Sequence, residues 1–349
     1  MPLLTLTARG LYCELGDFYV DPWEPVDRAV ITHAHGDHAT LGSRAYLTSE
    51  SGAGVLRARL EPNARIRGLP YGEPISLNGV TVSLHPAGHI LGSAQVRIVH
   101  RGEVWVVSGD YKTDPDPTCA PFEPVRCHTF ITESTFGLPI YRWPAQTEVF
   151  AEINGWWQAN ASAGKASMLY GYTLGKAQRL LAGLDPSIGP ILTHGAVERI
   201  TAAYRQAGVV LPPTRYAGTA ERRVDAKAAL VLAPPHASAS SWTRRFGPQS
   251  TAFASGWMLV RGARRRRSLD RGFPLSDHVD WPSLLTAIDA TGAGEVWVTH
   301  GFTGPVVRWL KERGLDARAV QTRFEGERDD EAVEGMEEMA AVQRGEPAT

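Results

Sequence analysis

Hydrophobic residues follow two different patterns along the chain. In roughly the first third, short runs rich in β-branched residues are bounded by Gly, Pro and Asp, which is typical of β-strands. These runs are residues 27–33, 79–89, 93–100, 103–110 and 128–135. Arg101-Gly102 separates two of them and predicts a hairpin turn. This part of the chain is therefore predicted to be mainly sheet.

The pattern changes after Pro144, where segments with helical periodicity alternate with apolar runs. Helices are predicted near residues 145–160, 175–184 and 196–206. The apolar runs between and after them are residues 166–173, 189–195, 227–235 and 250–257. Alternation of strands and helices is typical of a parallel α/β unit. From about residue 276 the first pattern returns, so we predict one α/β domain interrupted by a second.

The chain has 349 residues, of which 43% are hydrophobic, as in ordinary soluble domains. It contains no apolar run of about eighteen residues, and its first residues lack the basic flank and apolar stretch of a signal peptide. We therefore expect a cytoplasmic protein with no membrane association. Cys13, Cys119 and Cys127 show no CxxC spacing, so neither a disulfide framework nor a cysteine zinc site is predicted.

The formal net charge of −1 conceals an uneven distribution. Residues 325–349 hold nine acidic residues and two arginines, a net charge of −7, so the rest of the chain carries about +6. A moderately basic body suits a polyanionic ligand. A solvated acidic tail on a neutral enzyme explains the charge equally well.

Residues 30–42, VITHAHGDHATLG, place three histidines and an aspartate directly after a predicted buried strand. Alternate side chains of an extended segment share a face, so His33 and His35 should point the same way. Asp37 and His38 follow in a turn that is predicted to open a helix. Imidazole nitrogens and carboxylate oxygens are ligands of catalytic Zn²⁺, and Mn²⁺ or Fe²⁺ accept them too. The motif therefore predicts a metal site with room for two ions.

Three further candidate ligands lie at the carboxyl ends of predicted strands. His89 and Asp110 end the runs described above, and His300 ends the segment VWVTH. The active sites of α/β proteins are built at this end of the sheet. Singly each residue is weak evidence, but with the histidine motif they indicate one metal centre.

These motifs make the chain similar to proteins of the metallo-β-lactamase fold and, within that fold, to the β-CASP nucleases. The matching segments are FYVDPW around Asp21, THAHGDH, AGHILGSA, SGDY, TESTFG around Glu133, LSDHVDW around His278 and VTHGF around His300. The resemblance covers about residues 10–310. It implies an αββα sandwich at residues 1–137 and 278–349, with an inserted β-CASP α/β domain at residues 138–277.

The resemblance also implies a role for each motif residue. His33, His35 and His89 would hold one divalent ion, Zn²⁺ or Mn²⁺. Asp37, His38 and His300 would hold a second ion, and Asp110 would bridge the two. Such a pair of ions activates water for in-line attack on a phosphodiester.

Three more residues would assist this reaction. His278 would protonate the departing 3′-oxygen, leaving a 5′-phosphate on the other product. Glu133 would orient the His278 imidazole and keep it protonated. Asp21 would support the ligand histidines from behind.

The segments GDFYVDPWEPVDRAVITHAHGDHA and TESTFGLPIYRWP resemble the bacterial ligase-associated DNA exonucleases most closely. This predicts a 5′-to-3′ exonuclease for single-stranded DNA or DNA ends in DNA repair, with an ATP-dependent DNA ligase and a helicase as functional partners. One position departs from DNA-acting members of eukaryotes, which carry Val where this chain has His300, as RNA-processing members do. An RNA-processing nuclease and a non-catalytic nucleic-acid scaffold are the alternatives. A small-molecule hydrolase would share the histidine motif but would not need the inserted domain.

Arginines are concentrated between residues 244 and 271, where eight of them accompany one acid, Asp270. Guanidinium groups bind phosphate oxygens bidentately, so this segment is predicted to contact a nucleic-acid strand, with a solvated loop as the alternative. The candidate contacts are Lys176, Arg244, Arg245, Arg261, Arg264, Arg265, Arg266, Arg267 and Arg271. Lys176 is included because TLGKAQ would place helix-terminal amides near a phosphate. Tyr141, Trp143 and Trp257 are candidates for stacking on bases.

Overall fold

The computed structural model describes residues 2–218, 226–260 and 269–323. Contacts divide the chain between Arg142 and Trp143 and again between Asp277 and His278. The first unit therefore combines residues from both ends of the described chain, and the second unit contains residues 143–277. The second unit is thus an insertion in the sequence of the first.

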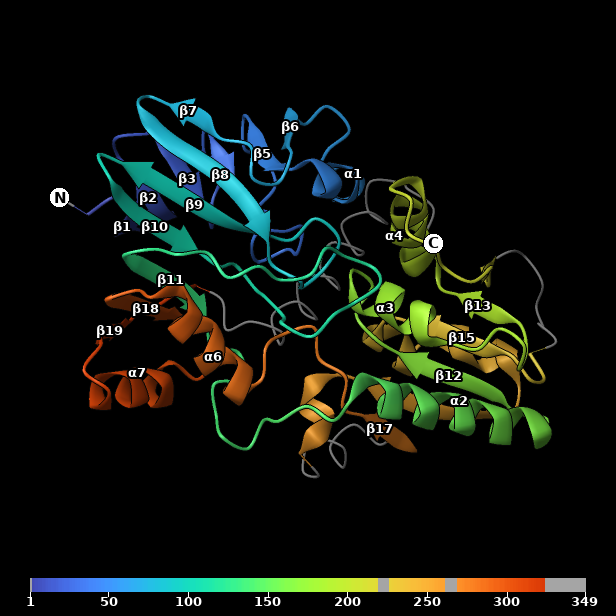
Figure 1. Ribbon diagram of the computed structural model, residues 1–349. Helices are drawn as coiled ribbons and strands as arrows, with labels where there is room; N and C mark the ends of the chain where they lie inside the picture. Colours follow the sequence, from blue (N-terminus) through green and yellow to red (C-terminus); the bar gives the residue numbers. More distant parts are fainter. Residues whose placement is uncertain (1, 219–225, 261–268, 324–349) are drawn as a thin grey trace. The chain divides into compact units, whose positions relative to one another are not determined.

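Two sheets form the core of the first unit (Figure 1). The first sheet consists, in spatial order, of β1 (Thr5–Thr7), β2 (Gly10–Cys13), β3 (Phe18–Val20), β4 (Ala29–Val30), β5 (Tyr46–Ser49) and β6 (Ile66–Leu69). The second consists of β19 (Asp316–Ala319), β18 (Glu295–Thr299), β11 (Thr129–Glu133), β10 (Glu103–Val107), β9 (Ala94–His100), β8 (Val80–Pro86) and β7 (Ile75–Leu77). The predicted hairpin joins β9 to β10, with Arg101 and Gly102 both at positive φ, as a type I′ turn requires.

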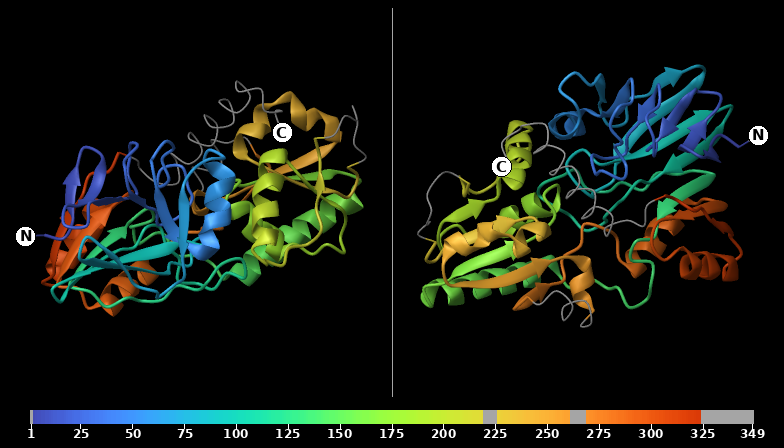
Figure 2. Two further views of the ribbon diagram at one scale, coloured as in Figure 1. Left: turned by 90° about the horizontal axis from the view of Figure 1, so that it is seen from above. Right: turned by 180° about the vertical axis from the view of Figure 1, so that it is seen from behind.

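One hydrophobic core lies between the two sheets. Phe18 and Val20 of the first sheet pack there with Val82 and Val96 of the second. Three helices complete the unit: α1 (Glu50–Arg59), α6 (Trp281–Thr291) and α7 (Thr303–Glu312). The helices α6 and α7 cover the outer face of the second sheet, and α1 packs against β5 and β6 (Figure 2). This is the αββα sandwich expected from the sequence.

The second unit is built on a parallel sheet. Its strands, in spatial order, are β14 (Arg215–Tyr216), β13 (Ile191–Thr193), β15 (Leu230–Ala233), β12 (Ala166–Tyr170), β16 (Gln249–Ala254) and β17 (Arg271–Phe273). The helices are α2 (Gln146–Ser162), α3 (Lys176–Gly183) and α4 (Gly195–Gln206). They pack on one face of the sheet, and short 3-10 segments within residues 235–259 cover the other. The parallel α/β pattern and the three helices predicted from the sequence are confirmed.

Among the described residues, no helix has the length and apolar character needed to cross a membrane.

Candidate metal centre

The histidine motif lies in a loop that follows β4. His33 and His35 come just after the strand, and the next residues form a single turn in which Ala39 N donates to His35 O at 2.8 Å. The prediction of a helix beginning at Asp37 and His38 is wrong, because only this one turn forms and no helix follows it. The loop is held by distant contacts instead, since the Arg59 guanidinium of α1 donates to Ala34 O.

The other motif residues meet the loop at one edge of the second sheet. The strands β8, β10, β11 and β18 all run in the same direction, so their carboxyl ends share an edge. His89, Asp110, Glu133 and His300 lie at or just beyond these four strand ends. The structure therefore brings together residues that are far apart in the sequence.

Two backbone positions at this edge require unusual geometry. Gly109, just before Asp110, has a φ of 57°, and a Cβ there would lie 2.6 Å from the Thr32 side chain. His300 has a φ of 49°, which is uncommon for a residue with a side chain. Such strained positions occur preferentially at functional sites.

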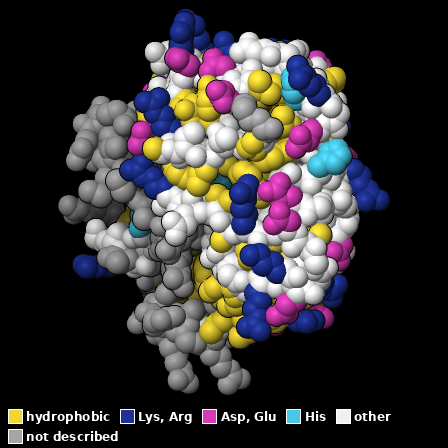
Figure 3. Space-filling model, turned by 90° about the vertical axis from the view of Figure 1, so that its left-hand side faces the viewer, with side chains coloured by type: hydrophobic (Ala, Val, Ile, Leu, Met, Phe, Trp, Pro, Cys, Tyr) yellow, Lys and Arg dark blue, Asp and Glu magenta, His cyan; other side chains and the backbone are white. Residues whose placement is uncertain are grey.

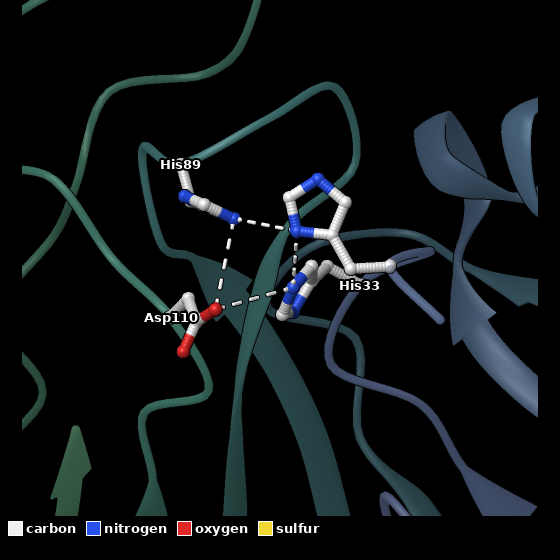
Figure 4. Close-up of side chains that lie close together, drawn as sticks. His33, His89 and Asp110 are labelled. Atoms are coloured by element: carbon white, nitrogen blue, oxygen red, sulfur yellow. Dashed lines mark hydrogen bonds and ion pairs between the residues drawn. The ribbon is translucent and has the colours of Figure 1, made fainter. Parts of the chain in front are cut away.

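The first group of candidate ligands consists of His33, His35, His89 and Asp110. His35 Nδ1 lies 3.1 Å from both His33 Nε2 and His89 Nε2. The Asp110 Oδ2 atom lies 3.5 Å from His33 Nε2 and 3.8 Å from His89 Nε2. Figure 4 shows His33, His89 and Asp110 pointing toward one another. Four donor atoms thus surround one point.

The second group consists of Asp37, His38 and His300. His38 Nε2 lies 3.5 Å from an oxygen of Asp37 and 3.5 Å from Oδ2 of Asp110. The ring centroids of His38 and His300 lie 5.4 Å apart. Because Oδ2 of Asp110 faces both groups, this one carboxylate connects them.

The charges of these buried groups depend strongly on one another. Burial and the neighbouring imidazoles of His38 and His89 hold the pKa of His33 well below its ordinary value. Burial also lowers the pKa of His300. For His38, burial opposes protonation, but the carboxylates of Asp37, Asp110 and Asp21 outweigh it and raise the pKa well above its ordinary value.

Asp21 and Thr32 fix the orientation of His38. Asp21 Oδ2 lies 2.7 Å from His38 Nδ1, and Asp21 Oδ1 accepts a hydrogen bond from Thr32 N at 2.8 Å. The Thr32 hydroxyl donates to Asp21 at 2.6 Å and lies 3.0 Å from His33 Nδ1. Asp21 thus lies behind the candidate ligand His38, and its supporting role stays a prediction. Thr32 was not among the predicted residues, and its position directly before His33 was the available signal.

Glu133 and His278 form a separate pair next to Asp110. Both carboxylate oxygens of Glu133 lie close to His278 Nδ1, at 3.0 and 2.9 Å. Glu133 Oε1 also accepts a hydrogen bond from Tyr111 N at 2.8 Å. Asp110 Oδ2 lies 3.9 Å from His278 Nδ1. The carboxylate therefore holds one nitrogen of the imidazole in place.

The donor atoms fit a pair of divalent ions. Ligands about 2.0–2.1 Å from a tetrahedral zinc ion lie about 3.3–3.4 Å from one another, close to the edges of the first group. In the second group, the buried His38 Nε2 has no hydrogen-bond partner among the described residues, although two carboxylates approach it. An ion there would complete the carboxylate–histidine–metal arrangement common in metalloproteins, with Asp21 as the carboxylate.

Comparisons with known proteins identify relatives, although no protein-family model matches the chain. A probable DNA ligase of Opitutus terrae is 34% identical over 323 residues, 92% of this chain and 31% of that protein. The DNA cross-link repair 1A protein of Mus musculus is 29% identical over 163 residues, 44% of this chain and 16% of that protein. The endoribonuclease ysh1 of Aspergillus fumigatus is 26% identical over 199 residues, 46% of this chain and 22% of that protein. The chain thus spans a third or less of the length of these relatives.

Among solved structures, a protein of unknown function from Enterococcus faecalis matches with a TM-score of 0.54 at 11% identity, over 78% of this chain and 74% of that chain. This likeness concerns the fold alone. The relatives, the sandwich and the motif residues at its strand ends agree on one family. The chain belongs to the β-CASP family of the metallo-β-lactamase fold. The family resemblance found in the sequence is thereby confirmed.

In this β-CASP chain, Lys176 does not lie where a phosphate could reach it. Its side chain is fully buried, and its ammonium lies 2.9 Å from Asp277 Oδ2 and donates to Leu275 O at 3.0 Å. Arg179, also buried, binds the other oxygen of Asp277 at 2.9 Å. The predicted phosphate contact of Lys176 is therefore corrected to a buried ion pair, which the sequence pattern alone could not distinguish from a phosphate-binding loop.

The remaining predicted contacts of the β-CASP chain are only partly described. Arg244 and Arg271 are exposed, and Arg245 is half-buried. Five of the predicted arginines, Arg261, Arg264, Arg265, Arg266 and Arg267, lie outside the described residues.

The three aromatic residues predicted to stack on bases differ in exposure. Tyr141 is buried against Phe136 and Phe302, so it offers no face to a base. Trp143 and Trp257 are half-buried.

Proposed function

We propose that this β-CASP chain is a two-metal nuclease that cleaves DNA from an end in the 5′-to-3′ direction. The observation that carries the proposal is the position of Asp110, whose Oδ2 atom faces the nitrogen donors of both candidate ligand groups. A carboxylate shared between two such groups suits a dinuclear centre. The relatives named as a probable DNA ligase and a DNA cross-link repair protein favour DNA as the substrate.

Each group of residues has a task in the proposed reaction. His33, His35 and His89 would hold one ion, Asp37, His38 and His300 the other, and Asp110 both. When bound, two divalent ions lower the pKa of a water molecule and neutralise charge on a phosphate. The low pKa of His33 favours the neutral imidazole that a metal needs. Asp21 accepts the proton of His38 Nδ1 and so leaves Nε2 for a metal.

His278 would deliver the proton that the departing 3′-oxygen requires. Glu133 binds its Nδ1 atom, so the proton to be transferred is the one on Nε2. The backbone amide of Tyr111 fixes the Glu133 carboxylate, and with it the plane of the imidazole. Asp37 and His278 would thus have different tasks, the first as a ligand of the second ion and the second in proton transfer.

The experiment is digestion of end-labelled single-stranded DNA with Mn²⁺ or Zn²⁺. We expect wild-type protein to release nucleotides from the 5′ end, and Asp37→Ala to release none. Asp17→Asn is the matched control, because Asp17 is an exposed aspartate of the turn before β3. The metal content of the same samples is measured as well. If wild type released no nucleotides with either ion, or bound no metal, the proposed nuclease function would be rejected.

An RNA-processing nuclease is the second candidate, favoured by the relative named as an endoribonuclease and by His300. DNA and RNA oligomers of one sequence, compared at equal concentrations, decide between them. Faster cleavage of RNA, or cuts inside the strand, would replace DNA exonuclease by this alternative. A DNA ligase and a helicase are proposed as functional partners, in keeping with the relative named as a probable DNA ligase.

A further inference from the structure

The strands β11 and β18 end side by side at the edge that carries the candidate metal centre. The last pair of their parallel register is Glu133 with Thr299, and the next residues along the two strands are Ser134 and His300. His300 is a candidate ligand of the second group, and its φ of 49° lies in the left-handed region, which residues with a side chain rarely adopt. Such a conformation persists only where surrounding contacts enforce it.

Ser134 supplies contacts of this kind. Its side chain is buried, and its hydroxyl can donate to Thr299 O, at 3.0 Å, or to His300 O. Its backbone carbonyl accepts a hydrogen bond from Phe302 N at 2.9 Å. Between these contacts Gly301 has a φ of 67°, and a Cβ there would lie 2.6 Å from Ser134 O. One residue thus binds the chain before, at and after His300.

The imidazole of His300 is also held by a hydroxyl group. Its Nδ1 atom lies 3.1 Å from Thr299 Oγ1. The Thr299 hydroxyl donates to Thr132 O at 3.1 Å, so its oxygen is left to accept the proton of His300 Nδ1. This leaves Nε2 of His300 for an ion, as Asp21 does for His38. The backbone and the ring of His300 are therefore both fixed by the ends of β11 and β18.

We propose that Ser134 is a positioning residue for the second ion, because its hydroxyl keeps His300 in the left-handed conformation that directs the imidazole toward Asp37 and His38. The proposal rests on the proposed two-metal function and specifies what holds one of its ligands in place. Without the hydroxyl, His300 can relax toward the ordinary backbone region, which turns its ring away. The histidines of the first group follow β4 and β8 instead. Loss of the hydroxyl should therefore weaken binding of the second ion and spare the first.

The test is calorimetric titration of the protein with Mn²⁺ alone. We expect wild type to bind two ions, and Ser134→Ala to bind one of them about 10- to 100-fold more weakly, the usual effect of losing a partner of a metal ligand, with the other unchanged. Ser240→Ala is the matched control and should bind both ions like wild type, because its hydroxyl also donates to a backbone carbonyl, that of Ala237 in the second unit. On the face shown in Figure 3, acidic side chains are interspersed with basic ones, so weak binding of Mn²⁺ to these surface carboxylates should be equal in all variants.

A second variant separates this role from a general effect on folding. His300→Ala should itself weaken binding of the second ion, and adding Ser134→Ala should cause no further loss, because the hydroxyl acts through His300. Ser134→Cys, which keeps a weak donor, should lie between wild type and Ser134→Ala.

Three results would overturn the proposal: unchanged affinities in Ser134→Ala, equal losses for both ions, or the same loss with and without His300. If wild type bound fewer than two ions, the two-metal function itself would be rejected, and the role of Ser134 with it.

Discussion

Replacing Asp277 by Ala removes a carboxylate shared by two buried cations. Lys176 and Arg179 are 0% and 2% exposed, and each lies 2.9 Å from one oxygen of Asp277. Removing one partner of a buried ion pair typically costs about 3–5 kcal/mol, because the remaining charge loses its compensation. Here Lys176 keeps its bond to Leu275 O and Arg179 its bond to Gln146, so we expect the lower limit, about 3 kcal/mol.

A loss of this size is readily measured. At about 2–4 °C per kcal/mol, Asp277→Ala should lower the melting temperature by about 6–12 °C. Urea unfolding followed by tryptophan fluorescence gives the same difference as a free energy. Glu312→Gln, which breaks the exposed pair with Arg308, is the matched control and should leave the melting temperature unchanged. If Asp277→Ala melted at the same temperature as the control, the buried ion pairs of Asp277 with Lys176 and Arg179 would have no net stabilising effect.

Three further predictions concern the candidate metal centre and the thiols. Mn²⁺ or Zn²⁺ should raise the melting temperature of wild type by ligand linkage and should not raise that of Asp110→Asn; equal shifts would place the ions elsewhere. Gly109→Ala should lower both stability and bound metal, as measured by calorimetric melting and elemental analysis, because its Cβ would displace Thr32; unchanged metal content would contradict this. Burial raises the pKa of Cys127 to about 11, so its reaction with a thiol reagent at pH 8 should be slower than that of Cys119 and should accelerate as the pH approaches that value.

The sequence predicted the strand-end residues well because each depends on local information. A strand of apolar residues followed within three residues by His or Asp can be recognised without knowing its neighbours, as for His89, Asp110 and His300. The rule that parallel strands end at one edge then brings them together. The helices of the second unit were found for the same reason, since the periodicity of residues 145–206 is itself local.

The conformation of the histidine loop could not be predicted in this way. Asp37 and His38 were expected to open a helix, but the loop follows contacts with residues distant in sequence. Arg59 binds the carbonyl of Ala34, and the Thr40 hydroxyl donates to Pro22 O at 2.7 Å. Such tertiary contacts override the local preference for a helix, and they involve residues outside any short stretch of sequence around the motif.

Lys176 shows why a motif must be judged by its surroundings. A glycine followed by a lysine at the start of a helix describes a phosphate-binding loop and an anchored helix equally well, and only the position of Asp277 distinguishes them.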